Sequence, residues 1–287
     1  MRQLIINIWQ FNTPMLSKSP VNTFLFFALA CEAKPFIAHF DFKKKLGQPV
    51  FEIYQTHGMV LTITGVGKSA MAAGVAYSLA LFKGEHAPVI VNIGIGGHQH
   101  ALLGRLFIAE KITDADSMKH YYPQCLPKTT LASAPLVTVS QAQAQYAPDT
   151  LYDMEASAFY ETATRFTSSE LTLIVKVISD NQQSAIHNIN AKQVSAWLFQ
   201  NMEAVTALLE QLNQRAQSLA RPDGAFGEIT RVLHFTASEK NQLHKLLLRW
   251  EVLSSNAALP LSAAAAPSAQ TFLQELNACI KNLPVLL

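Results

Sequence analysis

The sequence predicts a doubly wound α/β protein, in which helices cover both faces of a central sheet. Apolar runs rich in β-branched residues, such as 59–64 and 171–178, alternate with stretches at helical spacing, such as the Ala-rich 70–82. Glycines follow two of the predicted strands, at 65–67 and 94–97. Strands that alternate with helices, with glycines at the strand ends, are typical of such a sheet.

The elements follow one another in this order. Residues 1–22 are expected to form an N-terminal extension, because two prolines stand there among polar residues. Seven strands are then predicted, at 24–30, 51–57, 59–64, 89–93, 106–112, 136–139 and 171–178. The last run is apolar along its length, as expected of a strand buried on both faces. We expect this α/β domain to span residues 23–213.

Residues 214–287 predict a mainly helical C-terminal appendage. Thr236 and Glu239 form a capping box ahead of a helix. One face of that helix carries Leu243, Leu246, Leu247 and Trp250. Residues 228–235 suggest a strand, and 269–283 suggest a last helix. We expect these apolar faces to pack on the protein's own core, with a partner or subunit contact as the alternative.

Composition excludes several classes of function. Of 287 residues 49% are hydrophobic, and 22 basic and 20 acidic residues give a formal net charge of +2. This balance favours no nucleic-acid partner. Cys31, Cys125 and Cys279 form no Cys-x-x-Cys pair, which indicates neither a disulfide scaffold nor a structural zinc site. A reducing, cytoplasmic location fits these cysteines.

A membrane partner is not expected either. The apolar run at 24–31 could be a lipoprotein signal if translation began at Met15, but it is short and predicts a first buried strand equally well. No apolar run approaches the ~20 residues that a transmembrane helix needs.

The stretch 151–181 places one acid at the start of a predicted helix and another at the end of a predicted strand. Asp153 can cap the helix that begins after it, which places Glu155 in the first helical turn. Asp180 follows Ser179 at the end of the last buried strand. Because ligands bind at the carboxyl ends of strands in open α/β sheets, these two acids suggest a catalytic site. An N-cap and a loop aspartate without chemistry are the alternative.

The glycine segments suggest a small polar ligand. The segment 65–67 lacks the spacing of a P-loop, because Thr62 stands where the first glycine is required. We expect the loops at 65–67 and 94–97 to let the backbone approach a ligand. Tight turns without a ligand are the alternative.

Five motifs carry a family resemblance, and they follow one another over about residues 24–212. They are Phe27-Ala28-Leu29-Ala30-Cys31-Glu32-Ala33-Lys34-Pro35, Thr64-Gly65-Val66-Gly67-Lys68, Asn92-Ile93-Gly94-Ile95-Gly96-Gly97, Asp153-Met154-Glu155-Ala156 and Val177-Ile178-Ser179-Asp180. The ordered set resembles the nucleoside phosphorylase and nucleosidase superfamily, and within it the methylthioadenosine/S-adenosylhomocysteine nucleosidase and futalosine hydrolase type most. The resemblance implies a nucleoside phosphorylase-like, three-layer α/β/α fold with a mixed central sheet.

The resemblance also implies an activity, which is cleavage of the N-glycosidic bond of a purine nucleoside or a related nucleoside, without a cofactor or a metal. It implies that Asp180 protonates the base, that Glu155 binds the ribose hydroxyls and that Glu32 activates water. Asp180 would have to carry a proton near neutral pH, which burial favours. The residues expected beside the substrate are Met154, Ser179, Gly65, Gly67, Ile95 and Gly96. A homodimer and a role in purine salvage would fit the superfamily.

The chain departs from the family between Gly97 and Met154, where its segment is shorter. In the family that segment helps to form the base pocket and the oligomer contact. No base-stacking aromatic residue can be carried over, and Tyr121, Tyr122 and Tyr146 are candidates.

Several alternatives stay open at this point. His98 and His100 follow the glycines, but without a third ligand we expect a solvated loop rather than a metal site. The nucleophile is expected to be water. Phosphate, for which Arg105 is a candidate ligand, and a catalytically inactive nucleoside-binding protein are the alternatives.

Overall fold

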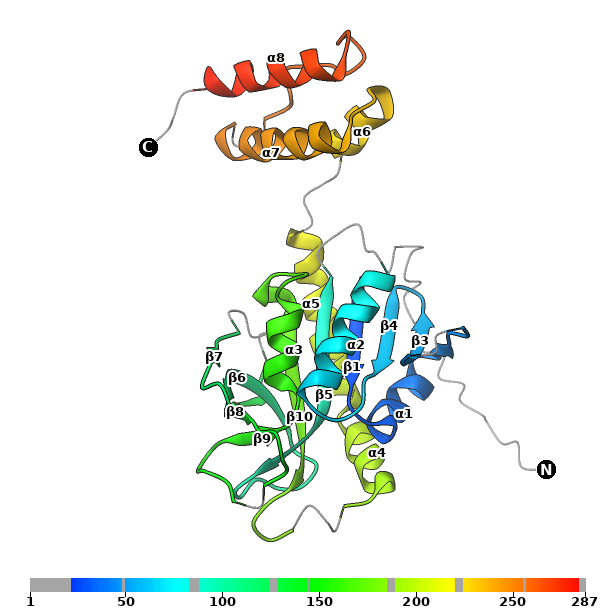
Figure 1. Ribbon diagram of the computed structural model, residues 1–287, viewed down its shortest axis with the longest axis vertical. Coiled ribbons are helices and arrows are strands. Elements are labelled where there is room, and N and C mark those ends of the chain that lie inside the picture. The colour runs from blue at the N-terminus through cyan, green and yellow to red at the C-terminus, as the bar shows by residue number, and fades with distance from the viewer. Residues whose placement is uncertain are drawn as a thin grey trace, which may run out of the picture. The chain divides into compact units, whose positions relative to one another are not determined.

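The computed structural model describes residues 22–47, 50–82, 88–123, 129–143, 145–184, 189–219, 224–254 and 257–283. The expected N-terminal extension lies outside these residues except for Asn22. The chain forms two compact units, Met1–Ala220 and Arg221–Leu287 (Figure 1). No helix in the described residues is long and apolar enough to cross a membrane.

The first unit is an α/β domain. Its strands are β1 (Thr23–Phe27), β2 (Lys43–Lys44), β3 (Glu52–Thr56), β4 (Met59–Ile63), β5 (Val89–His98), β6 (Leu106–Asp114), β7 (His120–Tyr121), β8 (Ala132–Thr138), β9 (Leu151–Asp153) and β10 (Thr172–Asp180). Its helices are α1 (Ala30–His39), α2 (Lys68–Leu81), α3 (Ala156–Ala163), the short 3₁₀ helix η1 (Ser169–Leu171), α4 (Ala191–Gln200) and α5 (Met202–Leu219).

The strands form one mixed sheet. β1 pairs in parallel with β4 and β5, and β5 pairs in parallel with β10. β10 continues antiparallel to β6, while β8 and β9 connect β6 back to β5, so these five strands close on one another. Every residue of β10 is buried, as its apolar run predicts. The predicted mixed sheet is therefore confirmed.

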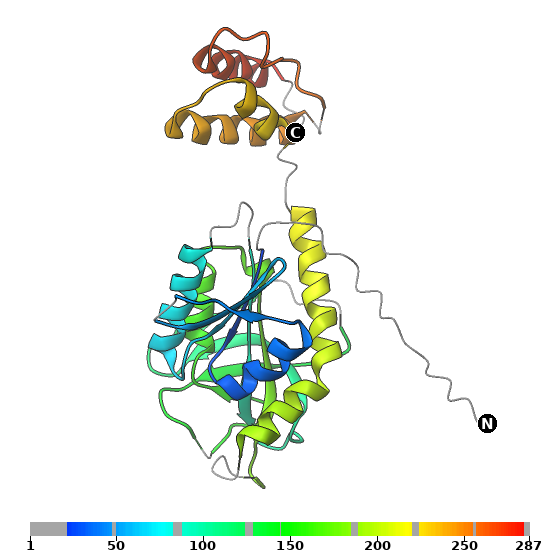
Figure 2. The same ribbon diagram turned by 90° about the vertical axis from the view of Figure 1, so that its right-hand side faces the viewer.

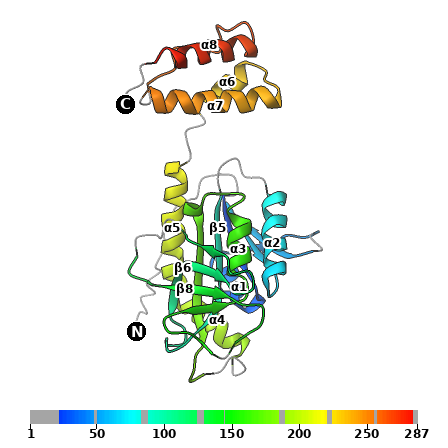
Figure 3. The same ribbon diagram turned by 60° about the vertical axis from the view of Figure 1, so that its left-hand side comes forward.

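Helices cover both faces of the sheet, as Figure 2 shows. On one face α1, α4 and α5 pack against side chains such as Leu25, Val91 and Val175. On the other face α2 and α3 lie side by side (Figure 3) and pack against Phe26 and Ile174. Alternate residues of the same strands therefore pack into two separate cores, because successive side chains of a strand point to opposite faces of the sheet. This arrangement confirms the three-layer α/β/α architecture.

The glycines at 94–97 do not form the expected loop. β5 continues through them to His98, because β10 pairs with β5 as far as Gly97 and β9 pairs with Gly97 and His98. His98 is buried, and its Nδ1 accepts hydrogen bonds from the N–H groups of His100 and Ala101. The expectation of a solvated loop is therefore wrong for His98, whereas His100 is exposed.

The second unit is helical. It contains α6 (Gly224–Val232), α7 (Ala237–Leu253) and α8 (Ala269–Lys281). Its own core includes Leu243, Trp250, Phe272 and Leu276, and the capping box of Thr236 and Glu239 opens α7 as expected. The strand expected at 228–235 is wrong, because residues 228–232 belong to α6 and residues 233–235 form neither helix nor strand.

The boundary expected after residue 213 falls inside α5. That helix continues to Leu219, and its Ala216 still belongs to the core of the first unit. The apolar spacing of Leu209, Leu212 and Ala216 at i, i+3 and i+7 keeps one helical face on the sheet past residue 213.

Candidate active site

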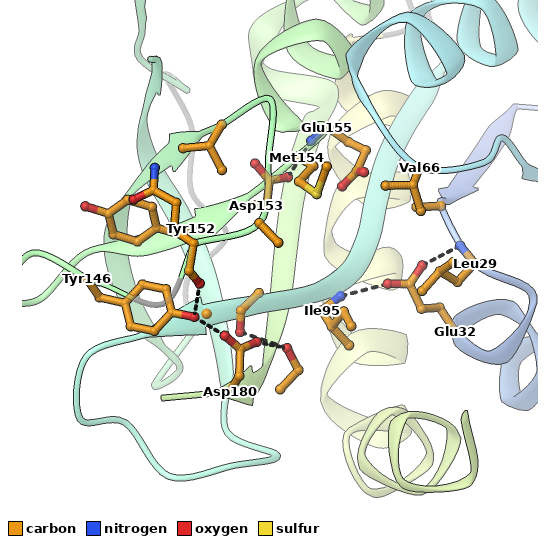
Figure 4. Close-up of a pocket in the computed structure, with 17 residues that line it drawn as sticks. Leu29, Glu32, Val66, Ile95, Tyr146, Tyr152, Asp153, Met154, Glu155 and Asp180 are labelled. Carbon is orange, nitrogen blue, oxygen red and sulfur yellow. Dashed lines mark hydrogen bonds between the residues drawn. The ribbon is translucent and has the colours of Figure 1, made fainter. Parts of the chain in front are cut away.

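Three parallel strands of the sheet end at the same edge, where the chain delivers its acids. β1 leads into α1, which carries Glu32, and β10 ends at Asp180. Between β1 and β10 lies β5, and β9 brings Asp153 to its end. The carboxyl ends of such strands are where α/β proteins bind ligands. A cavity of about 190 Å³ lies there (Figure 4).

In the described part of the chain, every charged residue that lines this cavity is an acid. These residues are Glu32, Asp153, Glu155 and Asp180. The other lining residues are Ala28, Leu29, Val66, Ile95, Gly96, Gly97, Val139, Ala142, Gln143, Tyr146, Tyr152, Met154 and Ser179. The cavity is thus an apolar pocket with a few polar groups, as ligand sites commonly are.

Two backbone N–H groups hold Glu32 in place. Leu29 donates to its Oε2 at 2.8 Å and Ile95 to its Oε1 at 2.9 Å (Figure 4). Glu32 is only 2% exposed. Burial raises the pKa of Glu32 to about 7, although the charge of Lys176 and the two N–H groups act to lower it. Glu32 therefore changes its charge near neutral pH, as a general base should.

Glu155 lies just before α3 and contacts the glycine segment at 65–67. Its Oε1 accepts a hydrogen bond from Gly67 N–H at 2.8 Å. Gly67 has a φ of 100°, a conformation that favours glycine. Burial raises the pKa of Glu155, although the charge of Lys176 lowers it. Gly67 thus positions an acid, and neither it nor Gly65 lines the cavity.

A buried lysine compensates the acids. Lys176 lies in the middle of β10, is 1% exposed and pairs with Asp153 Oδ2 at 2.8 Å. Burial lowers the pKa of Lys176, but the charges of Asp153, Glu155 and Glu32 outweigh burial and raise it. Lys176 is therefore a cation at neutral pH. A Cβ on Gly94 would lie 3.1 Å from Glu32 Oε1 and 3.3 Å from Lys176 Nζ, so glycine makes room for both.

Asp153 links this lysine to α3. As expected, its Oδ2 also accepts from the next backbone N–H groups, those of Glu155 at 3.2 Å and Ala156 at 2.8 Å. The expectation that Glu155 lies in the first helical turn is wrong, because α3 begins at Ala156 and Glu155 is its N-cap. The sequence reasoning missed Lys176. A signal was present, because a lysine inside an apolar strand is almost never buried without a partner.

Asp180 is also buried, and both of its carboxyl oxygens have partners. Ser179 Oγ donates to Oδ1 at 2.5 Å and lies 3.3 Å from the carbonyl oxygen of Gly96. The Tyr146 hydroxyl hydrogen-bonds with Oδ2 and also contacts the carbonyl oxygen of Gln143 at 2.8 Å (Figure 4). Asp180 is thus held from the strand on one side and from the β8–β9 connection on the other.

Among the three candidate tyrosines, Tyr146 lines the cavity and the other two lie elsewhere. Tyr121 donates its hydroxyl to Glu161 Oε2 at 2.6 Å. Tyr122 is 60% exposed. Tyr152, which the sequence reasoning did not single out, lines the cavity, with its ring centroid 5.3 Å from that of Tyr146.

Arg105, the candidate phosphate ligand, and Lys68, which ends the first glycine motif, both lie outside the cavity lining. Lys68 pairs with Asp114 at 2.9 Å and with Asp116 at 2.5 Å. The guanidinium of Arg105 stacks over the ring of Phe107, 4.9 Å from its centroid. In the described residues, no group of three or more His, Cys, Asp or Glu side chains could hold a metal ion.

The structure brings most of the residues singled out from the sequence to one place. Those in the cavity lining are Glu32, Ile95, Gly96, Met154, Glu155, Ser179 and Asp180. Gly65 and Gly67 lie outside the lining. Gly65 donates its N–H to the carbonyl of Ala28 at 3.1 Å, which ties the glycine segment to β1.

Solved structures share the fold of the first unit. An MTA/SAH nucleosidase superposes with a TM-score of 0.55 at 16% identity, over 68% of this chain and 97% of that one. The chain has the nucleosidase fold. The 5′-methylthioadenosine nucleosidase of Arabidopsis thaliana, in apo form, gives a TM-score of 0.56 at 16% identity, with the same coverage of 68% and 97%.

A third neighbour is the nucleosidase of S. pneumoniae, solved with the transition-state inhibitor MT-ImmA. It gives a TM-score of 0.51 at 16% identity and covers 66% of this chain and 99% of that one. Neither a protein-family model nor a curated protein matches the sequence. At such identities the likeness concerns the fold, and it confirms the predicted nucleoside phosphorylase-like architecture.

Proposed function

We propose that this protein hydrolyses the N-glycosidic bond of a purine nucleoside or a related nucleoside. The observation that carries the proposal is the convergence of Glu32, Glu155 and Asp180 on one cavity. Cleavage of a glycosidic bond passes through an oxocarbenium-like state. It needs an acid for the leaving group, negative charge near the sugar and a base that activates water, and these three acids provide one group for each.

Asp180 is the acid that protonates the leaving base. Asp180 is buried at the end of β10 and lines the cavity. The Tyr146 hydroxyl donates to its Oδ2 and Ser179 Oγ donates to its Oδ1. This position at the cavity supports Asp180 as the residue that faces the leaving base.

Glu155 binds the ribose hydroxyls, and Met154 packs on the sugar beside it. Glu32 takes the proton of the attacking water, a role that a pKa of about 7 supports. Lys176 keeps the buried acids from destabilising one another, because its charge offsets theirs. The oxocarbenium-like sugar would then form among carboxylates that favour its positive charge.

Water is a better nucleophile for this site than phosphate. A phosphate dianion needs converging cations, usually arginines. The charged lining is acidic throughout in the described residues, and Lys68 and Arg105 are engaged elsewhere. A carboxylate and a phosphate charge 4 Å apart repel by about 4 kcal/mol at an effective dielectric of 20. We therefore favour hydrolysis over phosphorolysis.

A panel of nucleosides tests the proposal. The solved neighbours named as 5′-methylthioadenosine nucleosidases make 5′-methylthioadenosine the first compound to try, followed by adenosine, inosine and their 5′-substituted analogues. We expect at least one purine nucleoside to release its free base, which is detected by chromatography.

The control variant is Glu161→Gln, which changes an acid bonded to Tyr121 and outside the cavity lining. It should cleave as fast as the wild type. If no member of the panel releases its base, the protein is a nucleoside-binding protein or has another function.

A further inference from the structure

Tyr146 fills part of the cavity in which the base would have to bind. A Cβ on Gly97 would lie 2.7 Å from the Cε1, Cζ and hydroxyl oxygen of Tyr146, so the ring lies directly on the backbone of β5. Only glycine at position 97 leaves space for it. Tyr146 is 8% exposed, and Tyr152 packs against its ring. The ring is therefore packed on β5 at Gly97.

The hydroxyl of Tyr146 hydrogen-bonds with Oδ2 of Asp180, which is the oxygen that would contact a substrate. Ser179, the preceding residue in β10, occupies Oδ1, and Tyr146 occupies Oδ2. A purine presents the same features as this phenol, namely a flat aromatic ring with polar atoms at one edge. Ring and hydroxyl together thus imitate a base bound to Asp180.

The small volume of the cavity agrees with a base subsite that the Tyr146 side chain already occupies. Its volume of about 190 Å³ is below the ~300–1,000 Å³ that is usual for small-molecule sites. Tyr146 lies on the connection between β8 and β9, which forms neither helix nor strand in its described residues 139–143 and 145–150. A side chain on such a connection can move without breaking a regular element.

We propose that Tyr146 occupies the base subsite in the ligand-free protein and that the base of the substrate displaces it from Asp180. This inference rests on the proposed function, because it takes the base to bind at Asp180. Each binding event must break the Tyr146–Asp180 hydrogen bond, so the apparent affinity is lowered by the fraction of molecules in which Tyr146 has moved away. Tyr146 is thus a positioning residue for Asp180 in the free protein and a competitor of the ligand.

The test uses free adenine and free hypoxanthine as probes, with affinity measured by isothermal titration calorimetry on the full chain. Tyr146→Phe keeps the ring and removes the competing hydroxyl, so it should bind a base about tenfold more tightly than the wild type. Tyr121→Phe is the matched control. It also loses a hydroxyl bonded to a carboxylate, but outside the cavity, and its affinity should stay within about twofold.

A second variant separates displacement from base stacking. Tyr146→Ala should bind adenine at least as tightly as the wild type if the ring only holds the place of the base. An affinity more than about threefold weaker in Tyr146→Ala would show that the ring stacks on the base, and would overturn the proposal. Unchanged or weaker affinity in Tyr146→Phe would overturn it as well.

The outcomes distinguish this proposal from the proposed function. If the wild type cleaves nucleosides but Tyr146→Phe binds bases no better, displacement is wrong and the hydrolase stands. If Tyr146→Phe binds a base more tightly but no nucleoside is cleaved, displacement stands in a protein that only binds. If neither base binds to either protein, displacement is wrong, because a freed Asp180 should bind one of them.

Discussion

Replacing Glu32 with glutamine should remove a pH-dependent penalty on folding. The pKa of Glu32 is raised from 4.5 to about 7 in the folded protein, mainly by burial. The folded state therefore keeps this proton at pH values where the unfolded chain has lost it. The resulting stability is fully present below pH 4.5 and is lost as the pH rises through 7. At 1.36 kcal/mol per pKa unit, the loss amounts to about 3 kcal/mol.

Urea unfolding at pH 4.5 and at pH 8 measures this effect. The glutamine of Glu32→Gln cannot ionise, so its free energy of unfolding relative to the wild type should rise by about 3 kcal/mol between the two pH values. Glutamine can accept a hydrogen bond from only one of Leu29 and Ile95. That loss is the same at both pH values and cancels in the comparison.

The control for this measurement is Glu161→Gln, because the pKa of Glu161 is lowered by its hydrogen bonds to Tyr121 and Lys119. Its ionised form stabilises the fold at high pH. The free energy of unfolding of Glu161→Gln relative to the wild type should therefore fall between pH 4.5 and pH 8, and by less than it rises for Glu32→Gln. Parallel stability curves for Glu32→Gln and the wild type from pH 4.5 to pH 8 would refute the reasoning about Glu32.

Four further predictions follow from the same contacts. Asp180→Asn should lower kcat by about 10²–10⁴-fold in the base-release assay while the protein stays folded, the loss expected for a general acid. Glu155→Gln should lower kcat/KM for ribonucleosides more than for their 2′- or 3′-deoxy analogues, because a ligand without the hydroxyl has no such bond to lose. Lys176→Met leaves Asp153 buried without its partner and should lower the free energy of unfolding by about 3–5 kcal/mol in urea. A chain that ends at Ala220 should keep the thermal midpoint of its α/β unit, whereas one that ends at Asn213 cuts α5 and should unfold at a lower temperature.

Much of the fold could be predicted because local patterns decide it. The run that became β10 is apolar and β-branched, and strands buried on both faces have this composition. The strand predicted at 228–235 is wrong for residues 228–232, which lie in α6, because a short run of β-branched and apolar residues does not distinguish a helix from a strand. The glycines at 94–97 were misread as a loop. Their pairing with β9 and β10 is a long-range contact that no local pattern reveals.

The acids of the candidate site could be found because each stands next to a strand end or a helix start. The residues that pair with these acids could not be found from the sequence. Lys176 within an apolar strand indicates a buried partner but not its identity, because its ion pair with Asp153 joins β9 and β10, which do not pair with each other. Tyr146 stands in a segment without periodicity, so nothing local indicates that it reaches Asp180.

The identity of the sugar product tests the central claim most directly. The best substrate of the panel is incubated with the protein at increasing phosphate concentrations, and the sugar product is identified by mass spectrometry. The account predicts a free sugar, formed at a rate independent of phosphate, because the charged residues in the described lining are acids. A sugar 1-phosphate formed in proportion to added phosphate would contradict it, and would leave Glu32 without a water to activate.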